Sequence, residues 1–175
     1  LEKFGLSESE VEDLVDEVER QEDLVRSTRK MRLQSILAEL RLGLAREGRV
    51  VGAPRLEDYV MEAVAYRDQQ TVEILAGDLG DLTERARNDG PVAVWSEADR
   101  DRAKFTCRVL GRLGLPECVE PLGRWIEVLG DEEMIVEAGI ALCRTRDARA
   151  ESYLLRARQR IGINSSSWRQ IARFF

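Results

Sequence analysis

Two similar stretches decide the fold of this 175-residue chain. Residues 109–123 read VLGRLGLPECVEPLG, and residues 141–155 read ALCRTRDARAESYLL. An offset of 32 residues aligns Leu110 with Leu142, Arg112 with Arg144, and Leu122 with Leu154. In each stretch one helix ends, and after a short turn Pro116 or Ala148 opens the next. A weaker copy, AVAYRDQQTVEIL, lies at 63–75. Such a period predicts stacked helix pairs, because one pair alone cannot bury both of its apolar faces.

Local capping patterns predict where the helices around these stretches begin and end. Ser96 with Asp99 three residues later predicts a helix start, and Gly114 before Pro116 predicts its end. By the same patterns, further starts are predicted at Asp131, Asp147 and Ser165 or Ser166, and further ends at Gly130, Gly162 and Asn164. Upstream, an apolar face over residues 72–82 predicts a helix that fades at the turn 88–91.

The N-terminal region has a different pattern. Ser7 and Glu10 have the spacing of a capping box, followed by a helical apolar stripe of Val11, Leu14, Val15 and Val18. Charged residues at 19–23 interrupt the stripe. Residues 8–47 therefore form either one long helix with a phase shift or two helices with a bend near 21–24, and we favour two. Gly48, Gly52 and Pro54 predict a loop. We expect an acidic-then-basic helical segment over 1–50 and a helical repeat domain over 51–175.

The segment GRLGLPECVEPLGRWIEVLGDEEMIVEAGIALCR, residues 111–144, resembles the HEAT-like repeats of phycobilin-lyase-type and scaffold proteins. The resemblance covers roughly residues 105–160: glycines at a helix end, a Pro-Glu helix start, a Val-x-x-Leu face and an Asp-capped next helix. It implies an all-α fold of antiparallel helix pairs stacked as a short HEAT-like α-solenoid, with an N-terminal helical appendage. The loop at 88–96 is longer than the turns of ideal repeats, and the N-terminal helices have no match to them.

The chain lacks the residues that most catalytic and metal sites need. It contains no histidine, which excludes Ser-His-Asp and Cys-His catalysis and histidine-based metal sites within this chain. It also contains no glycine-rich phosphate loop. Cys107, Cys118 and Cys143 have no CxxC spacing. We expect small buried thiols in a reducing cytosol, with a reactive thiol or a disulfide as the alternative. The sequence predicts no enzyme, no cofactor, no metal and a cytoplasmic location.

The charge of the chain is unevenly distributed. Residues 1–23 hold ten acids against Lys3 and Arg20, whereas residues 144–175 hold eight arginines against Asp147 and Glu151. We favour solvated helix faces as the explanation. The alternative is an attraction between the two ends, within one chain or between chains. The net charge of −6 counts against nucleic acid as a partner, and no segment is apolar enough to predict a membrane span.

Two groups of residues are candidates for binding a partner protein. The first is the apolar loop with Val94 and Trp95, which could instead fold back onto the core. The second is the C-terminal group of Trp168, Arg169, Arg173, Phe174 and Phe175, whose residue types are enriched at interface hot spots. Its alternative is a capping helix. An acidic group of Glu132, Glu133 and Glu137 could in principle do acid–base chemistry, but we favour surface residues that stabilise a helix start.

Three functions remain open. The favoured one is a protein-interaction module or scaffold that binds another protein on a helical-repeat surface. The first alternative is a nucleic-acid binder or DNA-repair-type enzyme on a HEAT-like scaffold, using Trp95 and Trp125. The second is a helical regulator that forms a homodimer through residues 7–47. Because the sequence begins with Leu1 rather than Met, we expect it to be part of a longer protein.

Overall fold

A computed structural model describes residues 8–41, 69–88 and 95–175. Within these residues every regular element is a helix and none is a strand, as the sequence predicts. The chain divides into two units, residues 1–35 and 36–175, which are described separately. Several predictions fall outside the described residues: the Ser7 cap, the loop at 48–54, the boundary at residue 50 and Val94.

The first unit contains most of a single long helix, α1 (Glu8–Arg41). The predicted bend near 21–24 is therefore wrong. Side-chain pairs one turn apart support the helix through the charged interruption. The carboxylate of Glu17 accepts hydrogen bonds from Arg20 (2.6 Å) and Gln21 (2.7 Å), and Asp23 pairs with Arg26 at 3.3 Å. With no glycine or proline to break it, a polar interruption changes only the surface of the helix.

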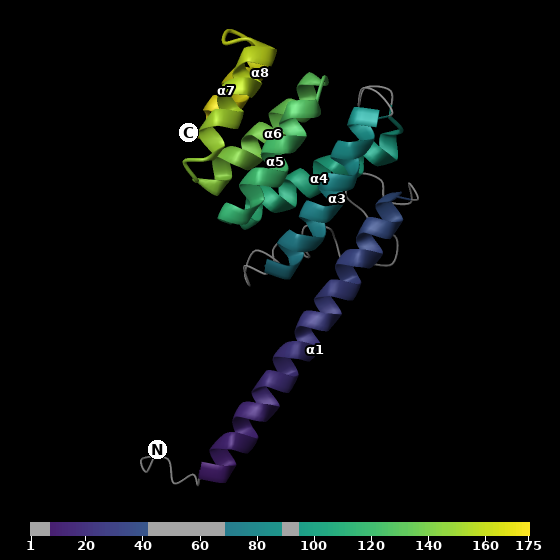
Figure 1. Ribbon diagram of the computed structural model, residues 1–175, viewed down its shortest axis with the longest axis vertical. Coiled ribbons are helices and arrows are strands. Elements are labelled where there is room, and N and C mark those ends of the chain that lie inside the picture. Colours follow the sequence, from purple (N-terminus) through teal and green to yellow (C-terminus); the bar gives the residue numbers. More distant parts are fainter. Residues whose placement is uncertain (1–7, 42–68, 89–94) are drawn as a thin grey trace. The chain divides into compact units, whose positions relative to one another are not determined.

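From α4 (Glu97–Leu113) onward, the helices of the second unit follow one another through short turns (Figure 1). In chain order its described elements are α3 (Gln69–Asn88), α4, the 3₁₀ turn η3 (Pro116–Cys118), α5 (Val119–Val128), α6 (Glu132–Thr145), α7 (Ala150–Ile161) and α8 (Ser166–Ala172). The predicted end of the helix over 72–82 at the turn 88–91 is confirmed, since α3 ends at Asn88.

Predicted caps hold the helix ends. Ser96 Oγ accepts a hydrogen bond from the amide of Asp99 (3.2 Å), and Asp131 Oδ1 accepts one from the amide of Met134 (3.0 Å). Ser165 caps α8 in the same way. Gly114 ends α4 in the left-handed conformation, with φ 61°. These are the partners that the otherwise unpaired terminal amides and carbonyls of a helix require.

The turn between α6 and α7 differs from the prediction. α6 ends at Arg146, which is left-handed with φ 53° although it is not a glycine. Asp147 does not cap α7, which begins at Ala150 with Arg149 before it. Instead, Asp147 Oδ1 accepts hydrogen bonds from the Arg149 amide (2.8 Å) and from its Nε (2.9 Å), which stabilises a turn ahead of the helix. These bonds lower the pKa of Asp147 to about 2.

The helices of this unit pack in alternation. α4 packs on α6, α5 packs on α7, and α3 contacts both α4 and α5 (Figure 1). Leu110 and Leu142, the first aligned pair of the repeat, are both fully buried on α4 and α6. Leu122 and Leu154 are buried on α5 and α7. The two copies of the repeat therefore occupy neighbouring positions.

Two glycines allow these helices to approach closely. A Cβ atom on Gly111 would lie 2.6 Å from the Cα of Ala141 on α6. A Cβ atom on Gly123 would overlap the ring of Tyr153 on α7. Real Cβ atoms do not make such contacts, so a larger residue at either position would push the helices apart. The repeat thus places a glycine at each of the two stacked interfaces.

A buried ion pair fixes α3 against α4. Arg102 Nε donates to Asp78 at 2.9 and 3.0 Å, and the hydroxyl of Thr106 donates to the same carboxylate at 3.3 Å. All three residues are buried. Because a buried charge is costly unless it is paired, this contact specifies one arrangement of the two helices more than it adds stability.

Substitution of Gly111 by alanine should lower the free energy of unfolding by about 1–3 kcal/mol, because the added methyl group overlaps the backbone of Ala141. Gly80→Ala on α3 is the matched control, since an added Cβ there has no atom within 4 Å. It should raise the free energy by about 0.5–1 kcal/mol through helix propensity. Chemical denaturation measures both. Equal stabilisation by the two variants would contradict the close packing of α4 on α6.

Candidate protein-interaction surfaces

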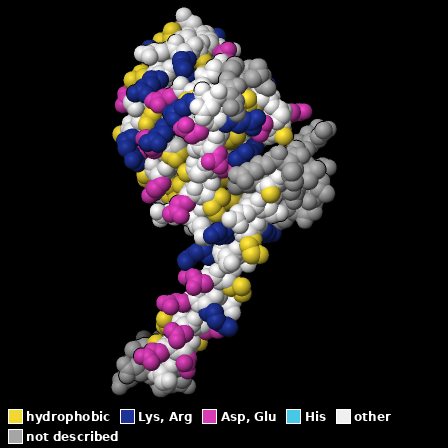
Figure 2. Space-filling view, turned by 45° about the vertical axis from the view of Figure 1, so that its right-hand side comes forward, with side chains coloured by type: hydrophobic (Ala, Val, Ile, Leu, Met, Phe, Trp, Pro, Cys, Tyr) yellow, Lys and Arg dark blue, Asp and Glu magenta, His cyan; other side chains and the backbone are white. Residues whose placement is uncertain are grey.

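The helix α1 carries an apolar stripe that is exposed to solvent. Side chains from Glu12 to Thr28 are all exposed. The exposed fractions of its large hydrophobic residues lie between 43% and 65%, for Leu14, Val15, Val18, Leu24, Val25 and Met31. Figure 2 shows hydrophobic side chains along this helix beside a concentration of acidic ones. We call Val11, Leu14, Val15, Val18 and Val25 the α1 stripe.

The spacing of the α1 stripe is that of a helix-binding seam. Val11, Val18 and Val25 lie seven residues apart, with Leu14 three residues after the first. At about 100° per residue these side chains share one face. In the first heptad, valine at the first position and leucine at the fourth are typical of two-stranded helical contacts, whereas the next two fourth positions hold Gln21 and Thr28. The sequence already contained this signal, because Val25 continues the seven-residue spacing across the charged interruption that led us to expect a bend.

Acidic residues border the α1 stripe. Five of them, Glu12, Asp13, Asp16, Glu19 and Glu22, make no ion pair with any described residue. Glu17 has an internal partner, since hydrogen bonds from Gln21 and then Arg20 lower its pKa. The N-terminal half of α1 is therefore an apolar face in a negative field.

A second exposed group lies at the C-terminus, on and around α8. Trp168 and Phe175 are in contact, with ring centroids 6.1 Å apart, and the guanidinium of Arg144 lies 5.0 Å from the centroid of Phe174. Phe175 is 75% exposed, and Arg169 and Arg173 are exposed on the same short helix. We call Trp168, Arg169, Arg173, Phe174, Phe175 and Arg144 the C-terminal patch.

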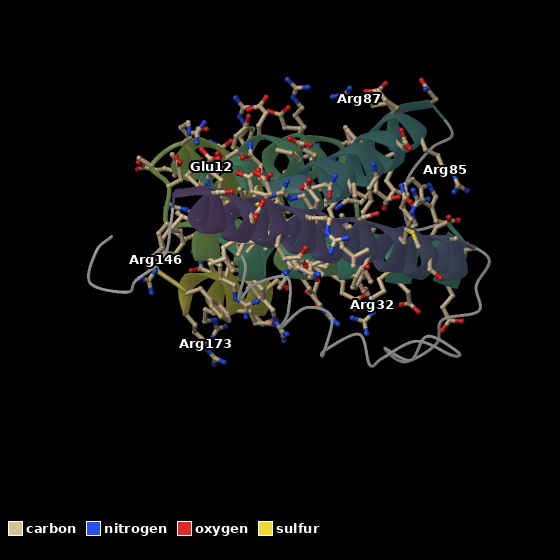
Figure 3. The ribbon with its side chains drawn as sticks, turned by 90° about the horizontal axis from the view of Figure 1, so that it is seen from below. Glu12, Arg32, Arg85, Arg87, Arg146 and Arg173 are labelled. Carbon is tan, nitrogen blue, oxygen red and sulfur yellow. The ribbon has the colours of Figure 1, made fainter. Side chains whose placement is uncertain are left out.

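The predicted C-terminal residues are thus brought together on one element, and Figure 3 shows the side chains of Arg146 and Arg173 extending outward from the helices. Ile171, from the opposite side of α8, is buried, and its Cδ1 lies within van der Waals reach of Gly139 on α6. The helix therefore serves as a cap for α6 with one face and presents the patch with the other. Leu155 and Ile163 are also exposed nearby in sequence, and sequence reasoning did not single them out.

Trp95 is buried in the hydrophobic core. It is only 8% exposed, and its ring centroid is 5.8 Å from that of the fully buried Trp125. The guanidinium of Arg85 covers it at 5.0 Å and pairs with Asp99 at 2.9 Å. Packing in this position matches the alternative in which the residue folds back onto the core.

The acidic group at the start of α6 is paired with basic residues of α4. Glu133 accepts hydrogen bonds from Lys104 (2.7 Å) and Arg100 (3.1 Å), and Glu137 accepts one from Arg108 Nε (3.0 Å). The bond from Lys104 is the main cause of the lowered pKa of Glu133. These ion pairs of Glu133 and Glu137 align α6 with α4.

A corresponding set of polar contacts joins α5 to α7. The Tyr153 hydroxyl donates to Glu120 at 2.8 Å, which is the first cause of the lowered pKa of that carboxyl. Arg160 Nη1 donates at 2.7 Å to the carbonyl oxygens of Ile126 and Leu129 at the end of α5. Basic side chains on α7 are therefore used in part within the fold.

The three cysteines are buried free thiols. Burial raises the pKa of Cys118 and of Cys143 to about 11, and it raises that of Cys107 further. A thiolate is the nucleophile and the metal ligand, so these side chains are in unreactive surroundings. Among the described residues, no group of three or more cysteine, aspartate or glutamate side chains is arranged to hold a metal ion.

No protein-family model matches this chain, and no curated protein or solved structure is significantly similar to it. The HEAT-like resemblance therefore stays a prediction. None of the helices in the described part has the length and hydropathy that crossing a bilayer demands.

The native thiols should react slowly with an aromatic disulfide reagent at about pH 8. A pKa of about 11 leaves on the order of one thiol in a thousand ionised at that pH, and burial adds a steric barrier. Absorbance of the released thiolate measures the rate. In denaturant all three should react fast. A native thiol that reacts as fast as in the unfolded chain would contradict the buried environment.

Proposed function

We propose that this chain is a protein-interaction scaffold, in which a helical-repeat body is joined to a helix that binds a helix of a partner protein. One observation carries the proposal. Within the described residues ten large hydrophobic side chains are exposed, and six of them lie on α1. A concentration of exposed apolar side chains on one element is typical of an interaction site.

The energetics favour a covering partner. Complete burial of a valine or leucine side chain contributes about 1.5–3 kcal/mol. An isolated helix is only marginally stable in water, because most helix stability in proteins comes from packing of the apolar face. A partner helix laid along the α1 stripe would both bury these side chains and stabilise α1 itself. Helix-in-groove and helix-on-helix binding use this 3–4 residue spacing of anchors.

For the body, the proposal is a short HEAT-like α-solenoid. Four features support it: α4 packs on α6, α5 packs on α7, the two copies of the repeat align at an offset of 32, and Gly114 and Arg146 occupy the same left-handed position in them. Repeats of this kind contact mainly their neighbours, and their surfaces hold extended partners. The C-terminal patch is the second candidate surface for a protein partner, because its aromatic and arginine side chains are hot-spot types.

The nucleic-acid alternative has less support. Trp125 is fully buried and Trp95 nearly so, which leaves little of either ring for stacking on a base. Three basic residues of α4, Arg100, Lys104 and Arg108, are paired with acids of α6. A protein partner is the better match to exposed apolar side chains in an acidic field.

Site-specific photo-crosslinking tests the proposal. A benzophenone amino acid at Val18 lies on the α1 stripe, whereas the same group at Arg20 lies two residues away on the opposite face and is the matched control. In cells that naturally produce the chain, ultraviolet light should yield a protein adduct from position 18 and none from position 20. Immunoblotting detects the adduct, and mass spectrometry identifies the attached protein.

Equal labelling from both positions would show that the contact does not depend on the α1 stripe. No adduct from either position would also contradict the proposed function.

A further inference from the structure

We infer that the α1 stripe of one copy of this chain binds the C-terminal patch of a second copy. The inference rests on the proposed function and names the partner of the same stripe. The first observation is the location of the exposed hydrophobic side chains. Of the ten in the described residues, six are on α1, and the other four are Leu155, Ile163, Phe174 and Phe175. Phe174 and Phe175 belong to the C-terminal patch, so the α1 stripe and this patch are two exposed apolar surfaces that lie far apart in the sequence.

The charges of these two surfaces are opposite. The first sixteen residues of α1, 8–23, contain nine acids and one base, Arg20. Residues 144–175 contain eight arginines and two acids. Complementary potentials of this kind raise the rate of association and select the partner.

Several of these charged residues have no ion-pair partner among the residues that the structure describes. Glu12, Asp16 and Glu19 make no ion pair with any described residue, and the same holds for Arg146, Arg169 and Arg173. Arg149 and Arg156, by contrast, are paired with Asp147 and Glu127. The residues left over are those that border the two apolar surfaces.

A parallel contact between two α1 helices is disfavoured by the same charges. With Val11, Val18 and Val25 in the seam of a parallel pair, Glu17 of one helix would face Glu22 of the other. An antiparallel pair centred on Val18 would again set acids against acids, because residues 12–23 hold a single arginine. An antiparallel pair centred near Val25 would instead bring the basic residues at 26–32 onto these acids, and the patch variants described below separate that contact from the one inferred here. The C-terminal patch has the opposite sign and offers aromatic anchors.

An association of this type is heterologous, since a different surface of each copy takes part. After one such contact, the first copy still has a free C-terminal patch and the second still has a free α1 stripe. Further copies can therefore join head to tail into rings or open chains. Charge steering should make the association weaker at high ionic strength, because surface charges are screened within about 8–10 Å at physiological salt.

A complementation experiment tests the inference on the full chain. The stripe variant Val18→Ser with Val25→Ser removes apolar surface from α1 without changing its charge. The patch variant Arg173→Glu with Phe175→Ser changes exposed residues of the C-terminal patch. Sedimentation velocity over a wide concentration range should show self-association of the wild-type chain and its loss in either variant alone. An equal mixture of the two should form a one-to-one dimer, because one intact stripe and one intact patch remain.

Circular dichroism checks that both variants keep their helix content. A second patch variant, Arg169→Glu with Arg173→Glu, changes charge alone on the surface of α8 and should lose association by itself and regain it with the stripe variant. The inference is overturned by a wild-type chain that stays monomeric at every concentration. It is equally overturned by a patch variant that self-associates like the wild type, which would assign the contact to two α1 helices. A photo-crosslink from position 18 to a different protein would leave the proposed function standing while removing this inference.

Discussion

The close approach of α4 and α6 is the constraint on which the rest of the repeat body depends. Gly111 has space for a hydrogen and for nothing larger, because the backbone of Ala141 fills the position where a side chain would begin. At this separation Leu110 and Leu142 are both fully buried, and Arg100, Lys104 and Arg108 reach the acids of α6. The close contact between Gly123 and Tyr153 sets the separation of α5 and α7 in the same way. Exposed ion pairs contribute little energy each, so the apolar contact sets the spacing and the charges set the alignment.

The apolar stripe of helix α1 is exposed, unlike the buried apolar faces of α4 and α6. Its stripe has the composition of a buried face, yet Leu14, Val18 and Val25 are exposed. The helices of the body reduce their exposed apolar area by packing on neighbours from the next pair. A single exposed hydrophobic residue needs no explanation, but a stripe at heptad spacing does. A partner helix bound along the α1 stripe would cover it. The opposite charge of the C-terminal patch favours a second copy of the chain as that partner.

The parts of the structure that sequence predicted are those that depend on local chemistry. Ser96, Gly114, Asp131 and Ser165 cap helices through their own backbone neighbours, so their positions could be inferred without the fold. The alignment of Leu110 with Leu142 predicted similar surroundings for the two residues, and both are fully buried, on α4 and α6.

What could not be predicted depends on contacts between distant residues. The burial of Asp78 with Arg102 joins residues 24 positions apart, and nothing in their local sequence distinguishes them from surface charges. The left-handed Arg146 was missed because the position normally favours glycine, and the turn is instead stabilised by Asp147. The bend in α1 was a wrong prediction because a polar interruption was read as a break. Among the candidate site residues, those at the C-terminus were proposed because aromatic and arginine side chains are common at interfaces. The burial of Trp95 against Trp125 could not be predicted, because composition does not indicate that contact.

The most direct test of the central claim, that a single copy leaves the α1 stripe uncovered, is amide hydrogen exchange at increasing protein concentration. Peptides covering residues 12–28 should exchange far faster than those of α4 and α6 in dilute solution, because no packed face protects them. At high concentration their exchange should slow while that of α4 and α6 stays unchanged. Protection of residues 12–28 equal to that of α6 at the lowest concentration would contradict the claim, since the stripe would then be covered within one chain.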